Sequence, residues 1–218
     1  MMKLISIAML MLAYCPMAEA KLRTVVIDPA AGGDYTGVQT RLFYEKDASL
    51  HIAQKIQSLL KSKRIQTTLT RFDDYPLTHA ERISIANQEK EAVWLSVHLG
   101  QALGASHIDI YTLDTLPSQR RETNFLIPIE KAHQPWISRS ILFANTLQET
   151  MPPALQPTLI HSDLAIASLL GVNHPAVMIE INLDTQTMQP AVFQNLLDEL
   201  SERISIAVAT FIKKERKL

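Results

Sequence analysis

The sequence is poor in cysteine: among its 218 residues there is one, Cys15. Cys15 lies in an N-terminal stretch, residues 1–20, which has a lysine near its start, an apolar run over residues 4–13 and the small-residue end Ala18-Glu19-Ala20. This order is typical of a secretory signal peptide, and we expect cleavage after Ala20. The apolar run is well short of the roughly 20 residues that a membrane span needs. The mature protein would then have no disulfide, no thiol nucleophile and no cysteine metal ligand, so any metal site must use His, Asp or Glu.

The chain also has little net charge and nothing that would divide it. Its 21 Lys and Arg residues nearly balance its 22 Asp and Glu residues, for a formal net charge of −1. Such a balance gives no field that would attract nucleic acid or an anionic membrane surface. We find no internal repeat, no low-complexity stretch and no linker, and residues 21–218 suit one core, since single cores grow to roughly 250 residues. We therefore expect one domain that recognises its partner through a site.

Short apolar strand patterns alternate with amphipathic helix patterns along the chain. The strands are expected at residues 23–28, 66–70, 92–97, 108–113 and 175–180. The helices are expected at residues 45–62, 80–88, 138–149 and 193–211, the last with one continuous apolar stripe. Such alternation implies crossover connections. It predicts a single α/β domain with a mostly parallel sheet of five or six strands, helices on both faces, and the last helix packed against the sheet.

Polar residues stand at the ends of several of these elements. Asp28, His98 and Glu180 each close a predicted strand, and Glu45 begins the first predicted helix. In open sheets of this kind, the carboxyl ends of the strands and the loops beyond them meet at one edge, where ligands bind. We expect the four side chains to lie near one another at that edge.

The segments around these residues resemble those of a known family. In chain order they read VVIDPAAGG at residues 25–33, EKD at 45–47, LTR at 69–71, AER at 80–82, SVH at 96–98 and PAVMIE at 175–180. No single motif is specific, but the ordered set resembles the zinc-dependent N-acetylmuramoyl-L-alanine amidases of bacterial cell walls. These enzymes cut the amide bond between N-acetylmuramic acid and L-alanine. The resemblance runs over nearly all of the chain after residue 20.

The resemblance implies a role for three of the residues. Glu45 and His98 match zinc ligands of the family, and Glu180 matches its general base. A bound zinc ion would polarise the amide carbonyl and lower the pKa of its water, and a nearby carboxylate would pass the proton to the leaving nitrogen. The resemblance further implies peptidoglycan or muropeptides as the substrate, a possible envelope protein partner, and a periplasmic or secreted location.

The chain departs from the family at three positions. Ala31 stands where the first zinc-binding histidine belongs, Tyr35 where the family has an aspartate, and Gly100 where it has an asparagine. A methyl group cannot bind a metal. Three hypotheses follow: a catalytically impaired amidase-like protein (a pseudoenzyme) that still binds peptidoglycan, an active zinc amidase with an unrecognised ligand, or a hydrolase of another amide that uses the remaining carboxylates.

Each candidate residue also has a purely structural explanation. His98 could be a buried strand-end histidine satisfied by the backbone, and Glu45 could simply favour a helix N-terminus. Arg71 and Arg82 are expected to be scaffold residues that pair with Asp73, Asp74 or Glu81. The remaining histidines show no ligand spacing and are expected at the surface: His51, His79, His107, His133, His161 and His174.

The segment from residue 114 to residue 136 could hold a regulatory insertion. In some amidases of the family, an inserted helix blocks the zinc until a partner removes it. With about 20 residues and three prolines, the segment leaves little room for such a helix and its hinges. We expect no control by that device.

Overall fold

The computed structural model describes residues 24–113, 132–162 and 166–215. The expected signal peptide at residues 1–20 and most of the segment 114–136 lie outside the described residues, so these two expectations stay untested. No helix in the three described ranges is both long enough and apolar enough to cross a membrane.

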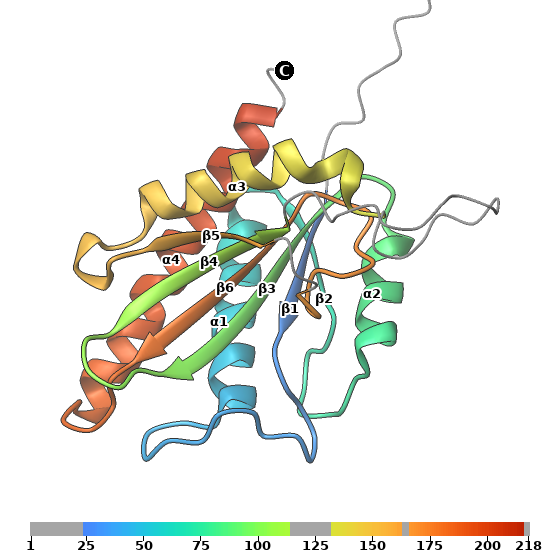
Figure 1. The fold of residues 1–218 in the computed structure, drawn as a ribbon. Coiled ribbons are helices and arrows are strands. Elements are labelled where there is room, and N and C mark those ends of the chain that lie inside the picture. The colour runs from blue at the N-terminus through green and yellow to red at the C-terminus, as the bar shows by residue number, and fades with distance from the viewer. Residues whose placement is uncertain (1–23, 114–131, 163–165, 216–218) are drawn as a thin grey trace, which may run out of the picture.

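The core of the molecule is one six-stranded sheet (Figure 1). In spatial order its strands are β2 (Gln66–Leu69), β1 (Thr24–Pro29), β3 (Ala92–Gln101), β6 (Ala176–Leu183), β4 (His107–Leu113) and β5 (Thr158–Ser162). All neighbours run parallel except β4 and β6, which are antiparallel. The mostly parallel sheet predicted from the alternation is therefore confirmed. Strand β5 was not expected from the sequence, because its short, half-exposed segment carries a weak apolar pattern.

Helices cover both faces of the sheet, as expected. The helices are α1 (Glu45–Ser62), α2 (His79–Gln88), α3 (Ile137–Thr150) and α4 (Pro190–Glu215), with single 3₁₀ turns at Gln134–Trp136 and Pro153–Leu155. Helices α1, α3 and α4 share one apolar cluster with alternate strand residues such as Val25 and Ile27. Helix α2 packs on the other face with Val26 and Trp94. Successive side chains of β1 therefore point into two separate cores, one on each side of the sheet.

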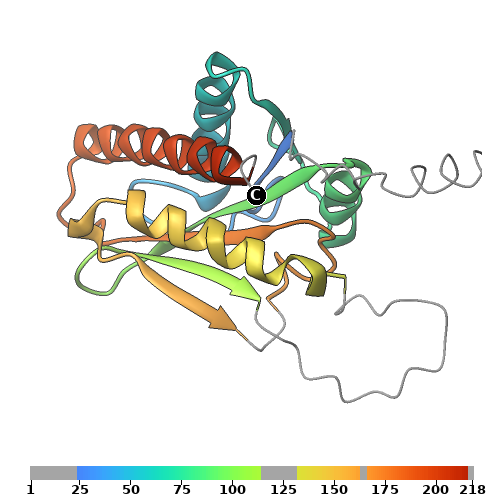
Figure 2. The same cartoon turned by 90° about the horizontal axis from the view of Figure 1, so that it is seen from above.

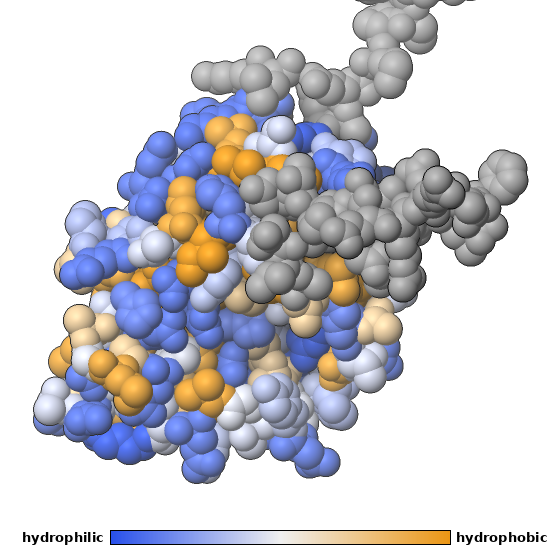
Figure 3. Space-filling view, viewed as in Figure 1, coloured by the Kyte–Doolittle hydropathy of each residue, from blue (hydrophilic) through white to orange (hydrophobic). Residues whose placement is uncertain are grey.

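Helix α4 is the longest element and closes the larger core. Figure 2 shows it beside α3, and its apolar stripe contacts both α1 and α3. Phe193 stacks on Phe43 at 5.4 Å between ring centroids, and Phe211 stacks on Phe143 at 4.7 Å. The face drawn in Figure 3 is mostly polar, with small apolar patches between the polar side chains. The amphipathic pattern of the last helix predicted the buried face well, since its stripe from Phe193 to Phe211 is buried except for the partly buried Leu196.

The sheet register brings the predicted polar residues together, although His98 and Glu180 lie inside β3 and β6 and not at their ends. Strands β1, β3 and β6 run in the same direction, so their carboxyl ends lie at one edge. Asp28 is in register with Ser96, and His98 is in register with Glu180. Residues in register on neighbouring strands point to the same face. His98 and Glu180 are therefore lateral neighbours although 82 positions separate them in the chain.

Candidate functional site

Glu45 and His98 form a hydrogen-bonded pair. Helix α1 begins at Glu45, whose Oε1 lies 3.1 Å from His98 Nδ1 and also accepts the Leu99 N–H at 3.4 Å. Its Oε2 accepts the Val38 N–H at 3.1 Å. Burial alone would raise the pKa of Glu45, but the hydrogen bonds from His98 and from the two backbone N–H groups hold it below the usual value. The pair is therefore best described as a carboxylate that accepts an Nδ1–H.

The other ring nitrogen of His98 faces two serine hydroxyls. Its Nε2 lies 3.0 Å from the Oγ of Ser168 and 3.2 Å from the Oγ of Ser96. Ser168 belongs to the turn before β6, and nothing in its sequence context marked it as a candidate. Both imidazole nitrogens of His98 thus have partners within the protein.

Glu180 occupies the neighbouring strand and has a partner of its own. The hydroxyl of Tyr111, on β4, donates to Glu180 Oε2 at 3.1 Å. Burial, together with the negative charge of Glu180, raises the pKa of Tyr111 to about 12. Tyr111 therefore stays protonated and acts as a donor. The structure brings the three predicted site residues, Glu45, His98 and Glu180, to the same edge of the sheet.

Gly100 is explained by the residue beside it. A Cβ built on Gly100 would lie 2.0 Å from Oδ1 of Asn182, on β6, and 3.6 Å from Oε1 of Glu180. The Asn182 side chain therefore fills the space into which a residue at position 100 would project. Its Nδ2 donates to Asp109 Oδ2 at 3.3 Å. An amide is present beside Glu180, but it comes from β6 and not from β3.

Two buried arginines hold the loop that contains Ala31. Arg82 pairs with Asp28 Oδ1 at 2.7 Å and donates to the backbone oxygen of Ala31, also at 2.7 Å. Arg71 is fully buried and donates to the oxygens of Ala30 and Lys46. The expected scaffold role is borne out, but the charged partner of Arg82 is Asp28, and Arg71 contacts Asp73 through the backbone oxygen of that residue, at 3.2 Å. Backbone carbonyls at the end of β1, 40 or more positions away, offered acceptors that sequence proximity could not reveal.

Two of the remaining histidines are not at the surface. His133 is 2% exposed and His174 is 5% exposed, which corrects the expectation for both. Their ring nitrogens lie within reach of backbone oxygens, His133 Nδ1 at 3.4 Å from Val172 and His174 Nε2 at 3.0 Å from Ala86. Satisfied in this way, an imidazole can be buried in neutral form, and burial lowers the pKa of His133 to about 4.

The side chains at this edge do not fit a three-ligand zinc site. Ala31 offers only a methyl group. Glu45 and His98 are hydrogen-bonded to each other, and the second ring nitrogen of His98, Nε2, faces two serine hydroxyls. Over residues 24–113, 132–162 and 166–215, no group of three or more His, Cys, Asp or Glu side chains is placed to hold a metal ion. A catalytic zinc site normally has three protein ligands and one open position.

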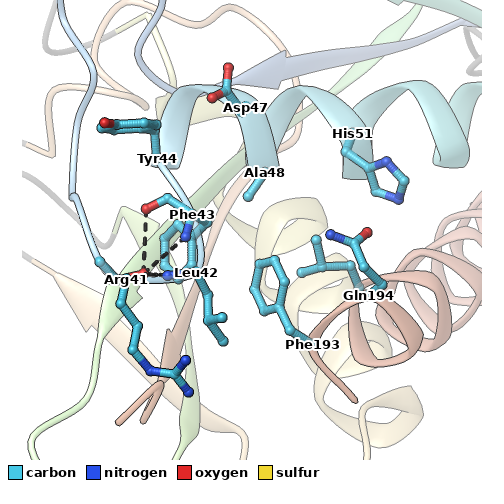
Figure 4. A pocket seen from close by; sticks show the side chains of 11 residues that line it. Arg41, Leu42, Phe43, Tyr44, Asp47, Ala48, His51, Phe193 and Gln194 are labelled. Atoms are coloured by element: carbon cyan, nitrogen blue, oxygen red, sulfur yellow. Dashed lines mark hydrogen bonds between the residues drawn. The ribbon is translucent and has the colours of Figure 1, made fainter. Parts of the chain in front are cut away.

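A pocket of about 440 Å³ opens beside the start of α1 (Figure 4). The close-up shows Phe193 and Gln194 of α4 facing Phe43, Ala48 and His51 across the opening. None of the three predicted site residues lines this pocket. It is therefore separate from the pair formed by Glu45 and His98.

Comparison with known proteins agrees with this architecture. The family model of N-acetylmuramoyl-L-alanine amidase matches residues 25–213. Among curated relatives, an uncharacterised protein, YqiI, of Bacillus subtilis is 28% identical over 99 residues, which are 44% of this chain and 48% of the relative. The probable N-acetylmuramoyl-L-alanine amidase AmiB of Haemophilus influenzae is 37% identical over 78 residues, or 34% of this chain and 18% of the relative. The matches thus span less than half of each of these relatives.

Solved structures show the same fold. The catalytic domain of CwlV, an N-acetylmuramoyl-L-alanine amidase from Paenibacillus polymyxa, superposes with a TM-score of 0.68 at 21% identity over 88% of this chain and 99% of that one. The CwlD amidase of Clostridioides difficile, solved in complex with the GerS lipoprotein, gives 0.57 at 19% identity over 89% of this chain and 98% of that one. At such identities the likeness concerns the fold, whereas the family model covers most of the sequence. The chain belongs to the N-acetylmuramoyl-L-alanine amidase family.

Proposed function

We propose that this protein is a peptidoglycan amidase-like protein of the cell envelope whose zinc-dependent catalysis is impaired. The observation that supports the proposal is the hydrogen bond between Glu45 and His98, which engages with each other the two side chains that the resemblance implies as zinc ligands. The resemblance implies a histidine as a further ligand at position 31, where this chain has alanine. Loss of a residue that only hydrogen-bonds to a zinc ligand typically lowers metal affinity or activity 10–100-fold. Loss of a direct ligand should cost more.

An active amidase is the alternative, and one observation favours it. Glu45, His98 and Glu180, the positions that match two zinc ligands and the general base, lie together at one sheet edge. In that case Glu180 would take the proton of the attacking water and pass it to the leaving nitrogen. The hypothesis requires a third ligand, supplied by a rearrangement or by residues outside the described ranges.

The substrate class, partners and location follow from the family and are proposed with it. Peptidoglycan or a muropeptide would bind along the edge that carries His98 and Glu180. Because CwlD is solved in complex with the GerS lipoprotein, an envelope protein is a reasonable partner for this chain as well. Both proposals agree with a periplasmic or secreted location, to which the expected signal peptide at residues 1–20 would direct the protein.

Calorimetric titration with zinc of the unmodified protein and of Ala31→His tests the proposal. Ala31 has φ 58°, in the left-handed region, where histidine is tolerated better than most side chains. We expect weak or no zinc binding by the unmodified protein and an affinity at least about 100-fold higher for Ala31→His, because the variant regains an imidazole ligand. Ala31→Asn is the matched control, since it also tolerates this conformation but adds no imidazole.

Tight binding of one zinc per unmodified chain would contradict the proposal, especially with muropeptide hydrolysis that is lost in Glu180→Ala. The active amidase would then be the correct description.

A further inference from the structure

The outer edge of strand β2 carries backbone groups that no other strand of the sheet covers. Strand β2 lies at one end of the sheet, next to β1 (Figure 1). The N–H of Thr70 donates to the oxygen of Ile27 at 3.1 Å, so the alternation along the strand turns the N–H and C=O groups of Thr67 and Leu69 away from β1. Over residues 24–113, 132–162 and 166–215, these outward groups have no hydrogen-bond partner.

A hollow of about 850 Å³ runs over this edge. Gln54 and Lys61 of α1 line it on one side, and Glu89 at the end of α2 lines it on the other. Both faces of β2 contribute, because Thr67 and Thr68 line the hollow and successive strand side chains point to opposite faces. The space beside β2 is therefore open along the strand, and its size lies within the range of roughly 300–1,000 Å³ that is typical of ligand sites.

The hollow is positively charged. Lys61 and Arg64 line it, and within the described part of the chain neither of them forms an ion pair. Glu89, the one carboxylate among the described lining residues, already accepts the hydroxyl of Thr68 at 2.9 Å. Arg64 has φ 59° at the position after α1 where glycine is usual, so the chain keeps a cationic side chain there at a steric cost. The charge of the hollow therefore fits an anionic partner.

Strand β2 itself has none of the residues with which natural proteins block an exposed edge. Its four residues, QTTL over Gln66–Leu69, include no proline, no lysine and no other charged side chain. Threonine is also a favourable residue in strands. An extended segment that reaches this edge can therefore form main-chain hydrogen bonds with Thr67 and Leu69.

We propose that an acidic, extended segment of a partner protein binds in this hollow by adding a strand to the outer edge of β2. The backbone groups of Thr67 and Leu69 hold the segment, and Lys61 and Arg64 attract its carboxylates. A second copy of this chain would bring positive charge to a positive hollow and fits less well. None of the three predicted site residues lines the hollow. The proposal therefore goes beyond the proposed function and does not depend on it.

Nuclear magnetic resonance of the isotope-labelled protein during titration with the hexapeptide acetyl-Val-Glu-Val-Glu-Val-Glu-amide tests the proposal. We expect saturable shifts of the amide signals of Thr67 and Leu69, and hydrogen exchange at least about 10-fold slower at both, because each N–H gains an acceptor. The peptide with lysine in place of each glutamate should bind at least about 10-fold more weakly, because the hollow repels it. The glutamate peptide methylated on every backbone nitrogen should also bind at least about 10-fold more weakly, since it keeps its charges but cannot pair as a strand.

Two sets of variants separate the charge of the hollow from the charge of the whole protein. Lys61→Glu combined with Arg64→Glu should weaken binding of the glutamate peptide at least about 10-fold, because two attractions become repulsions. Lys213→Glu, at an exposed position of α4 outside the hollow, is the matched control and should leave binding unchanged. Circular dichroism checks that each variant is folded.

The proposal is overturned if the glutamate peptide causes no saturable shifts, if the lysine or methylated peptide binds as tightly, or if the shifts lie away from β2. A dimer in sedimentation whose formation protects the amides of Thr67 and Leu69 would make a second copy the occupant and would also overturn it. Zinc binding, tight or weak, decides only the proposed function.

Discussion

Ala31, at the position where the resemblance implies a zinc ligand, has a strained backbone. Its φ of 58° lies in the left-handed region, which costs a residue with a Cβ roughly 1–2 kcal/mol. Two hydrogen bonds stabilise the conformation. Arg82 donates to the carbonyl oxygen of Ala31 at 2.7 Å, and the N–H of Ala30 donates to the carbonyl oxygen of Val97 at 3.0 Å. The loop therefore keeps its shape although the residue that it presents has no metal-binding atom.

We predict that Ala31→Gly raises the free energy of unfolding by about 1 kcal/mol, because glycine adopts a left-handed conformation without steric cost. Ala30→Gly is the matched control. Ala30 has no positive φ, so this change should lower the free energy of unfolding by roughly 0.5–1 kcal/mol through chain entropy. Urea denaturation of the three proteins measures both effects. Equal and destabilising effects of the two changes would contradict the strain at Ala31.

Strands β3 and β6 contact each other where a side chain of β6 fills the space beside a glycine of β3. Asn182 of β6 fills the position above Gly100 of β3 and donates to Asp109 of β4. A Cβ at position 100 would force Asn182 to rotate and to give up that hydrogen bond. The glycine and the asparagine therefore depend on each other.

We predict that Gly100→Ala lowers the free energy of unfolding by about 1–2 kcal/mol, since overpacking typically costs this much. In an Asn182→Ala background, the same change should be neutral or stabilising, because alanine suits a strand better than glycine once the space is free. The double-mutant cycle should thus give a coupling within roughly 0.5–3 kcal/mol. Additive effects of the two substitutions would show that the contact is not energetically important.

The elements that the sequence predicted well are those whose pattern is local. The sequence alone shows the long apolar stripe of α4 and the β-branched runs of β1, β3 and β6. The alternation of strands and helices then predicts the sheet. The convergence of His98 and Glu180 was predicted from places at strand ends, whereas β3 continues to Gln101 and β6 to Leu183. The two residues are neighbours because of the register of these parallel strands. Ser168 could not be found in this way, because its contact with His98 joins residues 70 positions apart and depends on the path of one turn.

The whole molecule contains buried histidines that link its stability to pH. His133 bridges Val172 and Ser140, and Ser140 in turn accepts the N–H of Ala176 at the start of β6. Burial lowers the pKa of His133 to about 4, and burial also lowers the pKa of His174. Between the unfolded pKa of about 6.5 and the folded value, the unfolded chain binds more protons than the native protein. The free energy of unfolding therefore falls as the pH drops through this window.

We predict that His133 alone contributes a loss of about 2 kcal/mol in the free energy of unfolding between pH 8 and pH 5, with His174 adding to it. Urea denaturation across this range measures the dependence. His133→Gln should be less stable at pH 8, because glutamine fits the ring site poorly, but its stability should fall less steeply with decreasing pH. His161→Gln, at an exposed position on the edge strand β5, should keep the slope of the unmodified protein. A slope that is unchanged in His133→Gln would mean that the pKa of His133 is not lowered in the native protein, which would contradict the burial of a neutral ring down to pH 5.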